Sequence, residues 1–381
     1  MKILHVFPFY SIKRGGGTIS LINRISNAQI ESGDDVTVLT GDYMLEEELI
    51  KKNHRINVIV LKSYLNFFGI YFMPGLFKFC YKNLKNFDII HMHLYRSIQN
   101  LIISFFANRQ NIHYVIDAHG SAPRHIKSKF FKKYLFDNLF GYKMLNKSSL
   151  LIAENEMSYK EYIDLGMKDE KIKIIRPPFP IDDYKNIPKK NLFKKKYNLE
   201  EKNLILFFGR IHWIKGIDIL VSAYSELLKL RDDIHLVIMG ADEGFKNDLD
   251  KQIKNLNLEK KVTFTGYLTG HYKLSCIVDS EVVVQTSRYE QGAGVVIEAV
   301  LCGVPIIVSN NSGAGDDVRR LNAGYIVKFN DIENLKNTIN YILENKREAK
   351  EKTYSGALNI IKNLSIKKNI LKYKEAYNDL I

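Results

Sequence analysis

Cysteine is scarce in this sequence. Cys80, Cys276 and Cys302 are the three cysteines among 381 residues, and they form no Cys-x-x-Cys motif. Small secreted domains rely on many cysteines for their disulfide frameworks, and zinc ribbons rely on closely spaced cysteine pairs. The sequence therefore argues against both kinds of protein and favours a reducing compartment.

Targeting signals and long apolar runs are absent as well. The residues after Met1 enter a strand-like pattern at once, without the charged and apolar regions of a signal peptide. The most apolar stretch, residues 65–81, is broken by Asn66, Pro74 and Lys78, so no run reaches the ~18 residues of a membrane span. We therefore expect a cytoplasmic protein.

The composition indicates a well-packed chain with two domains. Hydrophobic residues make up 46% of the chain and charged residues 26%, which is typical of globular rather than disordered proteins. A chain of 381 residues also exceeds the usual size of a single core. Two domains of ordinary size are therefore the first expectation.

Basic residues outnumber acidic ones. The 56 Lys and Arg residues against 42 Asp and Glu residues give a net charge of +14. Such a balance favours an anionic partner, either nucleic acid or an anionic membrane face. Because no recognised nucleic-acid motif occurs, we expect no nucleic-acid partner.

Lysines concentrate in residues 125–147, which contain six lysines and one acidic residue, Asp137. Apolar residues are interleaved there at about helical spacing: Phe130, Phe131, Tyr134, Leu135 and Leu139. The pattern predicts a basic amphipathic helix that contacts an anionic membrane surface, with residues 65–81 as a second contact. The alternative is an ordinary helix whose apolar stripe packs in the core.

Short apolar runs alternate with helical patterns along the whole chain. In the first half, strands are predicted at residues 2–7, 35–39, 57–61, 89–93, 114–118 and 150–153. In the second half, they are predicted at residues 204–208, 235–239, 262–265, 282–285, 305–308 and 324–327. Nearly continuous apolar runs are typical of parallel strands buried on both faces. The two series predict an α/β chain with two doubly wound, Rossmann-like domains facing a cleft.

Glu290 and Glu298 bracket a glycine-rich segment at a predicted helix start. Gly292 and Gly294 let backbone N–H groups approach an anion, and a helix N-terminus adds favourable potential. A helical path would place the two glutamate Cα atoms about 12 Å apart at ~1.5 Å per residue. Paired glycosidase carboxylates lie only roughly 5 to 9.5 Å apart. The pair therefore suits an elongated ligand with phosphates and hydroxyls, such as a nucleotide-sugar. The alternative is a surface loop and a helix with a solvated Glu298.

A second segment, from Gly209 to Gly216, follows a predicted strand and opens a helix. Arg210 offers a bidentate fork and Lys215 a point charge, which are the two ways in which proteins hold a diphosphate. The first turn of the next helix supplies free N–H groups. The P-loop pattern is absent. The alternative interpretation is that both cations are solvated loop charges.

The Gly15-Gly16-Gly17 segment follows the first strand. The dinucleotide pattern Gly-x-Gly-x-x-Gly fails because Ser20 occupies its last position. What remains is a loop whose backbone can approach a ligand closely, or a flexible connection.

Histidines occur after one predicted strand and within another. His119 ends the strand at residues 114–118, so its imidazole is expected to project into the cleft, where it could polarise a sugar hydroxyl or share a proton. The alternative is a structural histidine. His91 and His93 share one face of a strand and could ligate a metal, but no third ligand occurs at a useful spacing, so we expect no metal.

Together these segments resemble glycosyltransferase family 4 of the GT-B fold, over essentially the whole chain. The matching segments are the Glu290-x7-Glu298 pair, Gly209-Arg210, Lys215-Gly216, the Gly15 to Gly17 loop and His119-Gly120. The stretch from Glu298 to Pro305 is also similar to the family's helix and following strand.

The resemblance implies a retaining, metal-independent hexosyltransferase that needs no cofactor. Its donor would be a nucleotide-diphosphate sugar, and its acceptor a glycan or a lipid-linked saccharide in cell-surface polysaccharide or glycoconjugate synthesis. Residues 1–180 would form the acceptor-side domain and residues 181–365 the donor domain. Residues 366–381 would form a C-terminal helix that crosses back to the first domain. The protein would act at the cytoplasmic face of a membrane.

The resemblance also implies residue roles. Arg210 and Lys215 would neutralise the leaving diphosphate, and Glu298 would accept hydrogen bonds from the ribose hydroxyls. The residues predicted to be catalytic are Glu290, His119, Arg210 and Lys215. The residues predicted to bind the donor are Gly16, Gly17, Gly209, Tyr267, Gly292, Ala293, Gly294 and Glu298.

The chain departs from the family pattern at two places. Gly292-Ala293-Gly294 stands where family members have Gly-Phe-Gly, and residues 312–317 replace the usual Gly-Gly-x-x-Glu. The identity of the sugar therefore stays open. A nucleotide-sugar epimerase or a phosphorylase of the same fold is the alternative to a transferase, and a nucleic-acid-binding module is the alternative from a different class.

Overall fold

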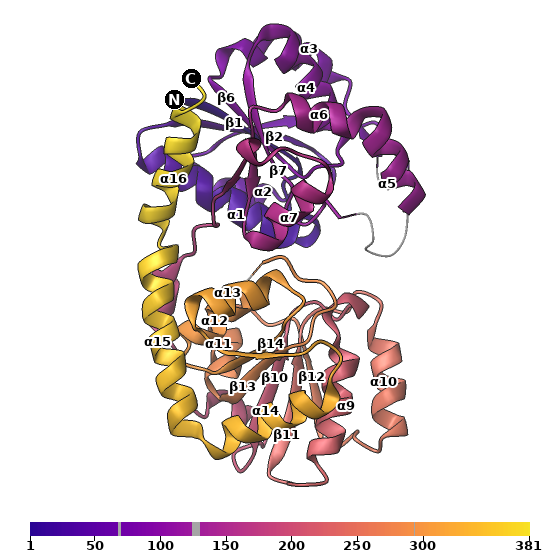
Figure 1. The fold of residues 1–381 in the computed structure, drawn as a ribbon, viewed down its shortest axis with the longest axis vertical. Helices are drawn as coiled ribbons and strands as arrows, with labels where there is room; N and C mark the ends of the chain where they lie inside the picture. Colours follow the sequence, from indigo (N-terminus) through magenta and orange to yellow (C-terminus); the bar gives the residue numbers. More distant parts are fainter. Residues whose placement is uncertain (68–69, 124–129, 293) are drawn as a thin grey trace. The chain divides into compact units, whose positions relative to one another are not determined.

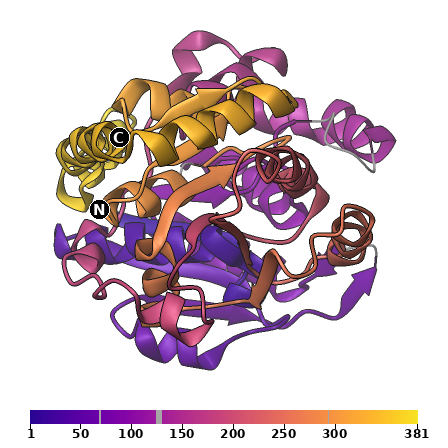
Figure 2. The same cartoon turned by 90° about the horizontal axis from the view of Figure 1, so that it is seen from below.

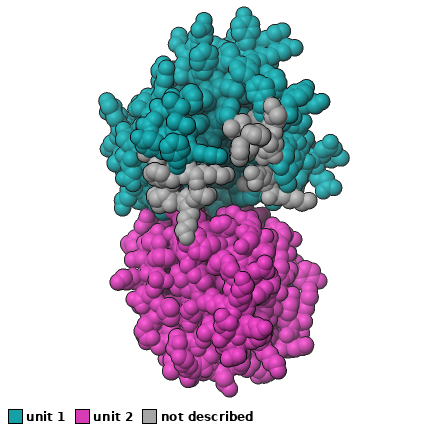
Figure 3. Space-filling view, turned by 90° about the vertical axis from the view of Figure 1, so that its right-hand side faces the viewer, with its two compact units in different colours: residues 1–179, 364–381 teal, residues 180–363 magenta. Residues whose placement is uncertain are grey.

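The computed structural model describes the chain except for residues 68–69, 124–129 and 293. Ala293 and residues 125–129 of the predicted basic helix thus lie outside the described residues. The chain forms two compact units (Figure 3). Unit 1 comprises Met1–Phe179 and Leu364–Ile381, and unit 2 comprises Pro180–Asn363.

Unit 1 is built on a parallel sheet with the strand order β3-β2-β1-β6-β7-β8-β9 (Figure 1). Its strands are β1 (Lys2–Phe9), β2 (Asp35–Gly41), β3 (Asn57–Leu61), β6 (Ile89–His93), β7 (His113–Asp117), β8 (Leu150–Ala153) and β9 (Ile172–Ile174). A separate antiparallel hairpin pairs β4 (Leu65–Phe67) with β5 (Ile70–Phe72).

The helices of unit 1 cover both faces of this sheet. They are α1 (Ile12–Glu31), α2 (Glu47–Lys52), α3 (Gly75–Asn83), α4 (Ile98–Gln110), α5 (Phe130–Phe136), α6 (Tyr142–Lys147), α7 (Glu156–Asp164) and α16 (Ile366–Asn378), with a π-helical turn η2 (Asp137–Gly141) between α5 and α6 and short 3-10 turns η1 (Leu84–Asn86) and η3 (Asp169–Lys171). Alternate residues of each strand face opposite sides. Leu4 and Ile90 accordingly join one buried cluster with residues of α3 and α4, whereas Ile3 and Ile89 join another with residues of α1 and α16.

The two chain ends lie close together in unit 1 (Figures 1 and 2). Met1 and Leu380 both pack against the buried cluster that contains Tyr373 and Tyr377 of α16. Helix α16 therefore covers the same face of the unit 1 sheet as α1.

Unit 2 is a six-stranded parallel sheet with the strand order β12-β11-β10-β13-β14-β15. The strands are β10 (Asn203–Phe208), β11 (Ile234–Met239), β12 (Val262–Gly266), β13 (Ser280–Gln285), β14 (Ile306–Ser309) and β15 (Tyr325–Val327). The helices are α8 (Leu192–Lys196), α9 (Ile217–Leu227), α10 (Lys246–Asn255), α11 (Gly270–Val278), α12 (Gly294–Leu301), α13 (Gly313–Leu321), α14 (Ile332–Glu344) and α15 (Lys346–Leu364), with 3-10 turns η4 (Ile181–Tyr184) and η5 (Trp213–Lys215).

The predicted α/β fold class is confirmed, because each predicted strand corresponds to an observed one within a few residues. Strand β9 was not predicted; it is a short edge strand whose three residues are only partly buried. The β4–β5 hairpin lies inside the apolar stretch 65–81. The uniformly apolar composition of this stretch hides the alternation of apolar and polar residues that predicts a strand. None of the described helices combines the length and the apolar character that a membrane crossing requires.

The glycine-rich segment after β1 differs from the predicted loop. Helix α1 already begins at Ile12, and only Gly16 breaks it, with φ 54° and ψ −134°. Gly16 has this left-handed φ at a point where no heavy atom lies within 4 Å of a built Cβ, and the position of Gly17 is equally open. The backbone at this break is therefore accessible, although it belongs to a helical segment.

Gly240 is a steric constraint on the unit 2 sheet. It follows β11, and a Cβ built on it would lie 1.7 Å from the carbonyl oxygen of Gly209. The backbone N–H of Gly240 donates to the Gly266 carbonyl, and that of Gly209 donates to the Met239 carbonyl, each at 2.9 Å. The ends of β10, β11 and β12 are thus held at a separation that only glycine permits.

We predict that Gly240→Ala lowers the stability of unit 2, because the added methyl group forces the strand ends apart. Overpacking of this kind costs about 1–3 kcal/mol, and each kcal/mol lowers Tm by roughly 2–4 °C in a unit of this size. Differential scanning calorimetry measures the shift. The control is Gly294→Ala, at the open first position of α12. A Gly240→Ala protein that melts with the wild type would contradict this account.

Candidate functional site

The strand order of unit 2 reverses between β10 and β13. In open α/β sheets, ligands bind outside the carboxyl ends of the strands at such a switch point, because the loops that follow the two strands diverge there. Lys215 lies in the loop after β10, and Glu290 lies in the loop after β13. The fold therefore brings two predicted catalytic residues to the same switch point.

Backbone contact between the two loops fixes their separation. Gly216 has φ 65°, and a Cβ built on it would lie 2.0 Å from the carbonyl oxygen of Thr286. The Thr286 hydroxyl donates to the Gly216 carbonyl at 2.8 Å. A glycine at this position is thus required both by its left-handed backbone and by the close approach of the neighbouring loop.

Arg288 also connects the loop after β13 to the segment after β10. Its guanidinium donates to both carboxylate oxygens of Asp218, at 2.7 and 2.6 Å, and to the carbonyl oxygen of Trp213 at 2.8 Å. It also lies 4.5 Å from the centre of the Trp213 ring, a cation–π arrangement. The sequence analysis missed Arg288, since nothing in its own neighbourhood shows that Asp218 lies opposite.

Lys215 and Glu290 form an ion pair at the switch point. Gln285, the last residue of β13, donates from Nε2 to Oε2 of Glu290 at 2.9 Å. The Lys215 side chain is 12% exposed and that of Glu290 is 17% exposed, so both are largely desolvated yet still accessible. An incoming phosphate can compete with Glu290 for Lys215, and the released carboxylate can then accept hydrogen bonds from hydroxyl groups.

Glu298, in α12, has partners that the sequence analysis did not predict. It forms an ion pair with Lys273 of α11 and a hydrogen bond with Tyr184 of η4. Burial, followed by the charge of Glu298 and the hydrogen bond to it, raises the pKa of Tyr184. Glu298 is therefore held by a cation and a phenol on different elements. It lies in the helix that directly follows the loop of Glu290.

Arg210 does not join Lys215. It is 58% exposed and pairs with Glu243, after β11, at 2.7 Å. Gly209 beside it has φ 148°. Tyr267 follows β12 and is 69% exposed. The structure thus brings Lys215 to Glu290 but gives Arg210 a different acid.

The glycines before α12 are open. No heavy atom lies within 4 Å of a Cβ built on Gly292 or on Gly294. The backbone N–H of Gly313 donates to the Glu290 carbonyl at 2.8 Å, which fixes the start of this loop on α13. The space beside the two glycines is consistent with the close backbone approach expected there.

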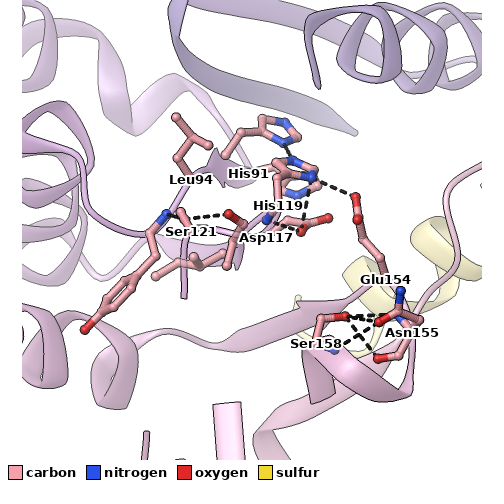
Figure 4. A network of polar contacts seen from close by, with 12 residues as sticks. His91, Leu94, Asp117, His119, Ser121, Glu154, Asn155 and Ser158 are labelled. Carbon is pink, nitrogen blue, oxygen red and sulfur yellow. Dashed lines mark hydrogen bonds and ion pairs between the residues drawn. The ribbon is translucent and has the colours of Figure 1, made fainter. Parts of the chain in front are cut away.

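In unit 1, His119 follows β7 in a turn of left-handed backbone, with φ 45° at His119 and 75° at Gly120. Its Nδ1 lies 2.8 Å from Oε1 of Glu154 (Figure 4), and its Nε2 lies 2.8 Å from Nδ1 of His93. The side chain is only 4% exposed. Neighbours from the strands on both sides thus bind both ring nitrogens, and the imidazole is almost fully enclosed within unit 1.

The contacts of His93 continue into the core of unit 1. Its Nε2 lies 2.9 Å from Nδ1 of His5 on β1, and Nε2 of His5 lies 2.7 Å from Oε1 of Gln29 on α1. On the same face, Nδ1 of His91 lies 2.8 Å from the hydroxyl of Tyr377 on α16. His5, His91 and His93 are all fully buried.

His5 is the third histidine that the sequence analysis did not find beside His91 and His93. It is distant in sequence, but β1 pairs with β6 so that His5 is opposite His91. Two nitrogens bound to one zinc ion at ~2.0–2.1 Å lie roughly 3.3 Å apart in tetrahedral geometry. The 2.9 Å between His5 and His93 is instead the length of an ordinary hydrogen bond.

Burial and charge shift the histidine pKa values in opposite directions. Burial lowers the pKa of His5 to about 4 and holds the pKa values of His91 and His93 well below their ordinary value. Burial alone also disfavours a charged His119, but the charges of Asp117 and Glu154 and the hydrogen bond to Glu154 outweigh it and raise its pKa to about 9. Burial raises the pKa of Asp117. His119 is thus the cation of the group.

Two family models match this chain. "Glycosyltransferase Family 4" matches residues 15–183, and "Glycosyl transferases group 1" matches residues 189–358. An uncharacterised glycosyltransferase of Methanocaldococcus jannaschii is 26% identical over 99% of this chain and 98% of its own length.

Solved structures share the fold. The structure of HepE from Anabaena, in complex with UDP and glucose, has a TM-score of 0.81 at 19% identity, with 100% of both chains covered. WaaG, described as a glycosyltransferase involved in lipopolysaccharide biosynthesis, has a TM-score of 0.73 at 15% identity, covering 98% of this chain and 99% of its own.

Two Rossmann-like units with polar loops at the carboxyl ends of their strands define a protein of the GT-B class. Within that class, the chain belongs to glycosyltransferase family 4. The predicted resemblance is confirmed, and the roles of the individual site residues stay predictions.

We predict that the core of unit 1 becomes less stable as the pH rises from about 7 to 9. The pKa of His119 is raised from 6.5 to about 9 in the folded protein, so its stabilising charge is fully present below pH 6.5 and is lost as the pH passes 9. Hydrogen exchange of the β6 and β7 amides measures this unit by itself.

The matched variants are His119→Asn and His113→Asn. Asparagine tolerates the left-handed backbone of residue 119 but removes the titrating group, so the decline should flatten. His113 lies at the exposed start of β7, so His113→Asn is the control and should keep the decline in stability. An equal decline in His119→Asn would show that another group is responsible.

Proposed function

We propose that this glycosyltransferase moves a hexosyl unit from a nucleotide-diphosphate sugar to a glycan or lipid-linked saccharide acceptor. Transfer would retain the anomeric configuration and require no metal ion, and it would serve cell-surface polysaccharide or glycoconjugate synthesis. The observation that carries the proposal is the accessible Lys215–Glu290 pair at the switch point of unit 2.

The pair has the chemistry that a departing nucleoside diphosphate requires. Lys215 supplies a fixed cation for the charge that develops on the leaving phosphate, a contribution that is larger in a desolvated site than in water. Glu290 would exchange its contact with Lys215 for hydroxyl groups of the donor sugar. Glu298, held between Lys273 and Tyr184, would accept hydrogen bonds from the ribose.

Further features support the donor and the acceptor class. The open backbone at Gly292 and Gly294 leaves room for phosphate or sugar oxygens. HepE, which shares the fold, was crystallised with UDP and glucose. The description of WaaG as acting in lipopolysaccharide biosynthesis supports a surface-glycan role for a chain of this fold. Lys215 takes the charge-neutralising role for which other transferases use a divalent cation.

The first experiment is a thermal-shift screen against UDP-, GDP- and ADP-sugars, because a bound donor raises the apparent stability of the protein. Turnover with the donor so found is then measured with a panel of glycan and lipid-linked acceptors. Retention is read from the anomeric configuration of the product by NMR. Release of nucleoside diphosphate coupled to sugar transfer supports the proposal. A changed sugar on the nucleotide would indicate an epimerase, and phosphate-dependent cleavage would indicate a phosphorylase.

We predict that Lys215→Ala lowers kcat by roughly 10²–10³, the typical cost of losing one donor to a developing negative charge. Glu298→Ala should chiefly raise KM for the donor. Lys229→Ala is the matched control, because Lys229 is an exposed lysine that pairs with Glu226 at the far end of α9. Full activity in both site variants would refute the assignment.

We further propose that unit 1 contacts an anionic membrane through α5, η2 and α6. Large apolar side chains are exposed along this segment: Phe131, Tyr134, Leu135, Leu139 and Phe140. The apolar stripe is therefore not packed in the core, and Lys132, Lys133, Lys143 and Lys147 lie in the same segment. On α3, Phe77 and Tyr81 of the apolar stretch 65–81 are exposed as well. Apolar insertion combined with lysine charge is how interfacial helices bind anionic lipids.

We predict that the protein co-sediments with anionic liposomes at low salt and that Phe131→Glu with Leu139→Glu abolishes this binding. The added charges oppose both insertion and attraction to the lipid headgroups. Leu230→Glu is the control, since Leu230 is equally exposed but belongs to unit 2. Binding that survives the double substitution, or that Leu230→Glu also removes, would place the contact elsewhere.

A further inference from the structure

The chain of hydrogen bonds through His119, His93 and His5 has acceptors at both ends. Oε1 of Gln29 is an amide oxygen and accepts, so Nε2 of His5 must donate. Oε1 of Glu154 is a carboxylate oxygen and also accepts, so Nδ1 of His119 must donate. The two ends therefore determine the positions of the protons between them.

The intervening protons follow in order. A neutral His5 with its proton on Nε2 has a lone pair on Nδ1, which must accept from Nε2 of His93. A neutral His93 then has a lone pair on Nδ1, which must accept from Nε2 of His119. His119 thus donates from both ring nitrogens, which only an imidazolium can do.

A separate observation leads to the same protonation state. Oδ1 of Asp117 lies 3.4 Å from Nδ1 of His119 and accepts from its backbone N–H at 3.2 Å. Asp117 and Glu154 are both buried. Two acidic groups at such a site need a cation between them, because an uncompensated buried charge is costly.

The backbone at His119 and Gly120 is the part of the structure that the charged imidazole holds in place. His119 is a non-glycine residue with φ 45°, and Gly120 after it has φ 75°. A left-handed conformation is unfavourable for a non-glycine residue. The bonds from both ring nitrogens, with the Asp117 contact to the backbone, offset this cost and fix the turn at the carboxyl end of β7.

We propose that Glu154 and Asp117 hold His119 as an imidazolium at neutral pH, and that His93 and His5 complete a directed hydrogen-bonded chain that makes His119 a positioning residue for the turn His119–Gly120. His119 in this turn is one of the residues predicted to be catalytic. The positioning role therefore rests on the proposed function, whereas the protonation state does not.

Other titratable groups interact with His119 or with its acidic partners Asp117 and Glu154. They are His91 on β6, Tyr162 on α7 with its neighbour Glu161, and Tyr373 and Tyr377 on α16. The tyrosine pKa values are raised by burial, so these phenols stay neutral in the range in which His119 titrates. His91 stays neutral because burial lowers its pKa.

The test of the protonation state is long-range proton–nitrogen NMR on the full-length, nitrogen-15-labelled protein between pH 5 and 9. We expect His119 to show two protonated nitrogens through neutral pH, and His93 and His5 to show the neutral form protonated at Nε2. Wild-type protein suffices for this measurement. A neutral His119, or histidines protonated at Nδ1 in a chain of opposite direction, would overturn the proposal.

The variant Glu154→Gln tests whether the charge of Glu154 keeps the second proton on His119. An amide oxygen at this position still accepts but carries no charge, so His119 should lose its second proton at lower pH. Glu156→Gln is the matched control, because this neighbouring carboxylate pairs with Arg176 at 2.5 Å instead. His93→Gln is a second variant that interrupts the chain on the other side. His119 titration that is unchanged in Glu154→Gln would refute the role of Glu154.

Activity tests the positioning role separately. With the donor found by the screen, Glu154→Gln should raise KM for the donor several-fold and move the alkaline decline of kcat/KM to lower pH. Glu156→Gln should change neither. Unchanged KM and pH profile in a Glu154→Gln protein whose His119 titrates at lower pH would refute positioning. A wild-type protein that transfers no sugar from any donor would refute the proposed function alone, since the NMR result stands without it.

Discussion

The reversal of strand order within each parallel sheet is the constraint on which the sites depend. Parallel strands place all their carboxyl ends at one edge, and only at a reversal do the loops of two neighbouring strands diverge. In unit 2 this happens between β10 and β13, and the loops carry Lys215 and Glu290. In unit 1 it happens between β1 and β6, whose side chains begin the histidine chain. Backbone contact of Gly216 with Thr286 then sets how closely the unit 2 loops approach.

The two units use their buried charges differently. In unit 2, Lys215 and Glu290 are paired but still accessible, so a ligand can replace either partner. In unit 1, both nitrogens of His119 are bound within the protein, and the side chain is almost fully enclosed. Unit 2 therefore has the properties of a site that exchanges contacts with a charged ligand. In unit 1, by contrast, both ring nitrogens of His119 already have partners within the protein.

The fold could be predicted from the sequence because buried parallel strands leave a strong local signal. Runs such as residues 204–208 and 235–239 are apolar throughout, and they became β10 and β11. The weaker elements left no such signal: β9 is a half-buried edge strand, and the β4–β5 hairpin lies in a stretch of uniform apolar composition. The loops with site residues could be located for the same reason, since each follows a strong strand. Glu154 also follows a strand directly, so its position offered a signal that the sequence analysis did not use.

The sequence by itself determined the α/β class, the two series of strands, the family, and the positions of Lys215, Glu290 and His119 in the segments that follow strands. Only the tertiary structure decided the partners: Glu290 for Lys215, Lys273 for Glu298, Glu243 for Arg210, and Glu154 with His93 for His119. The physical reason is the distance along the chain over which each kind of signal acts. Apolar periodicity and turn residues act over a few positions along the chain. A charged side chain instead selects its partner through space, after strand order and register have brought distant segments together, as β1 and β6 bring His5 to His93.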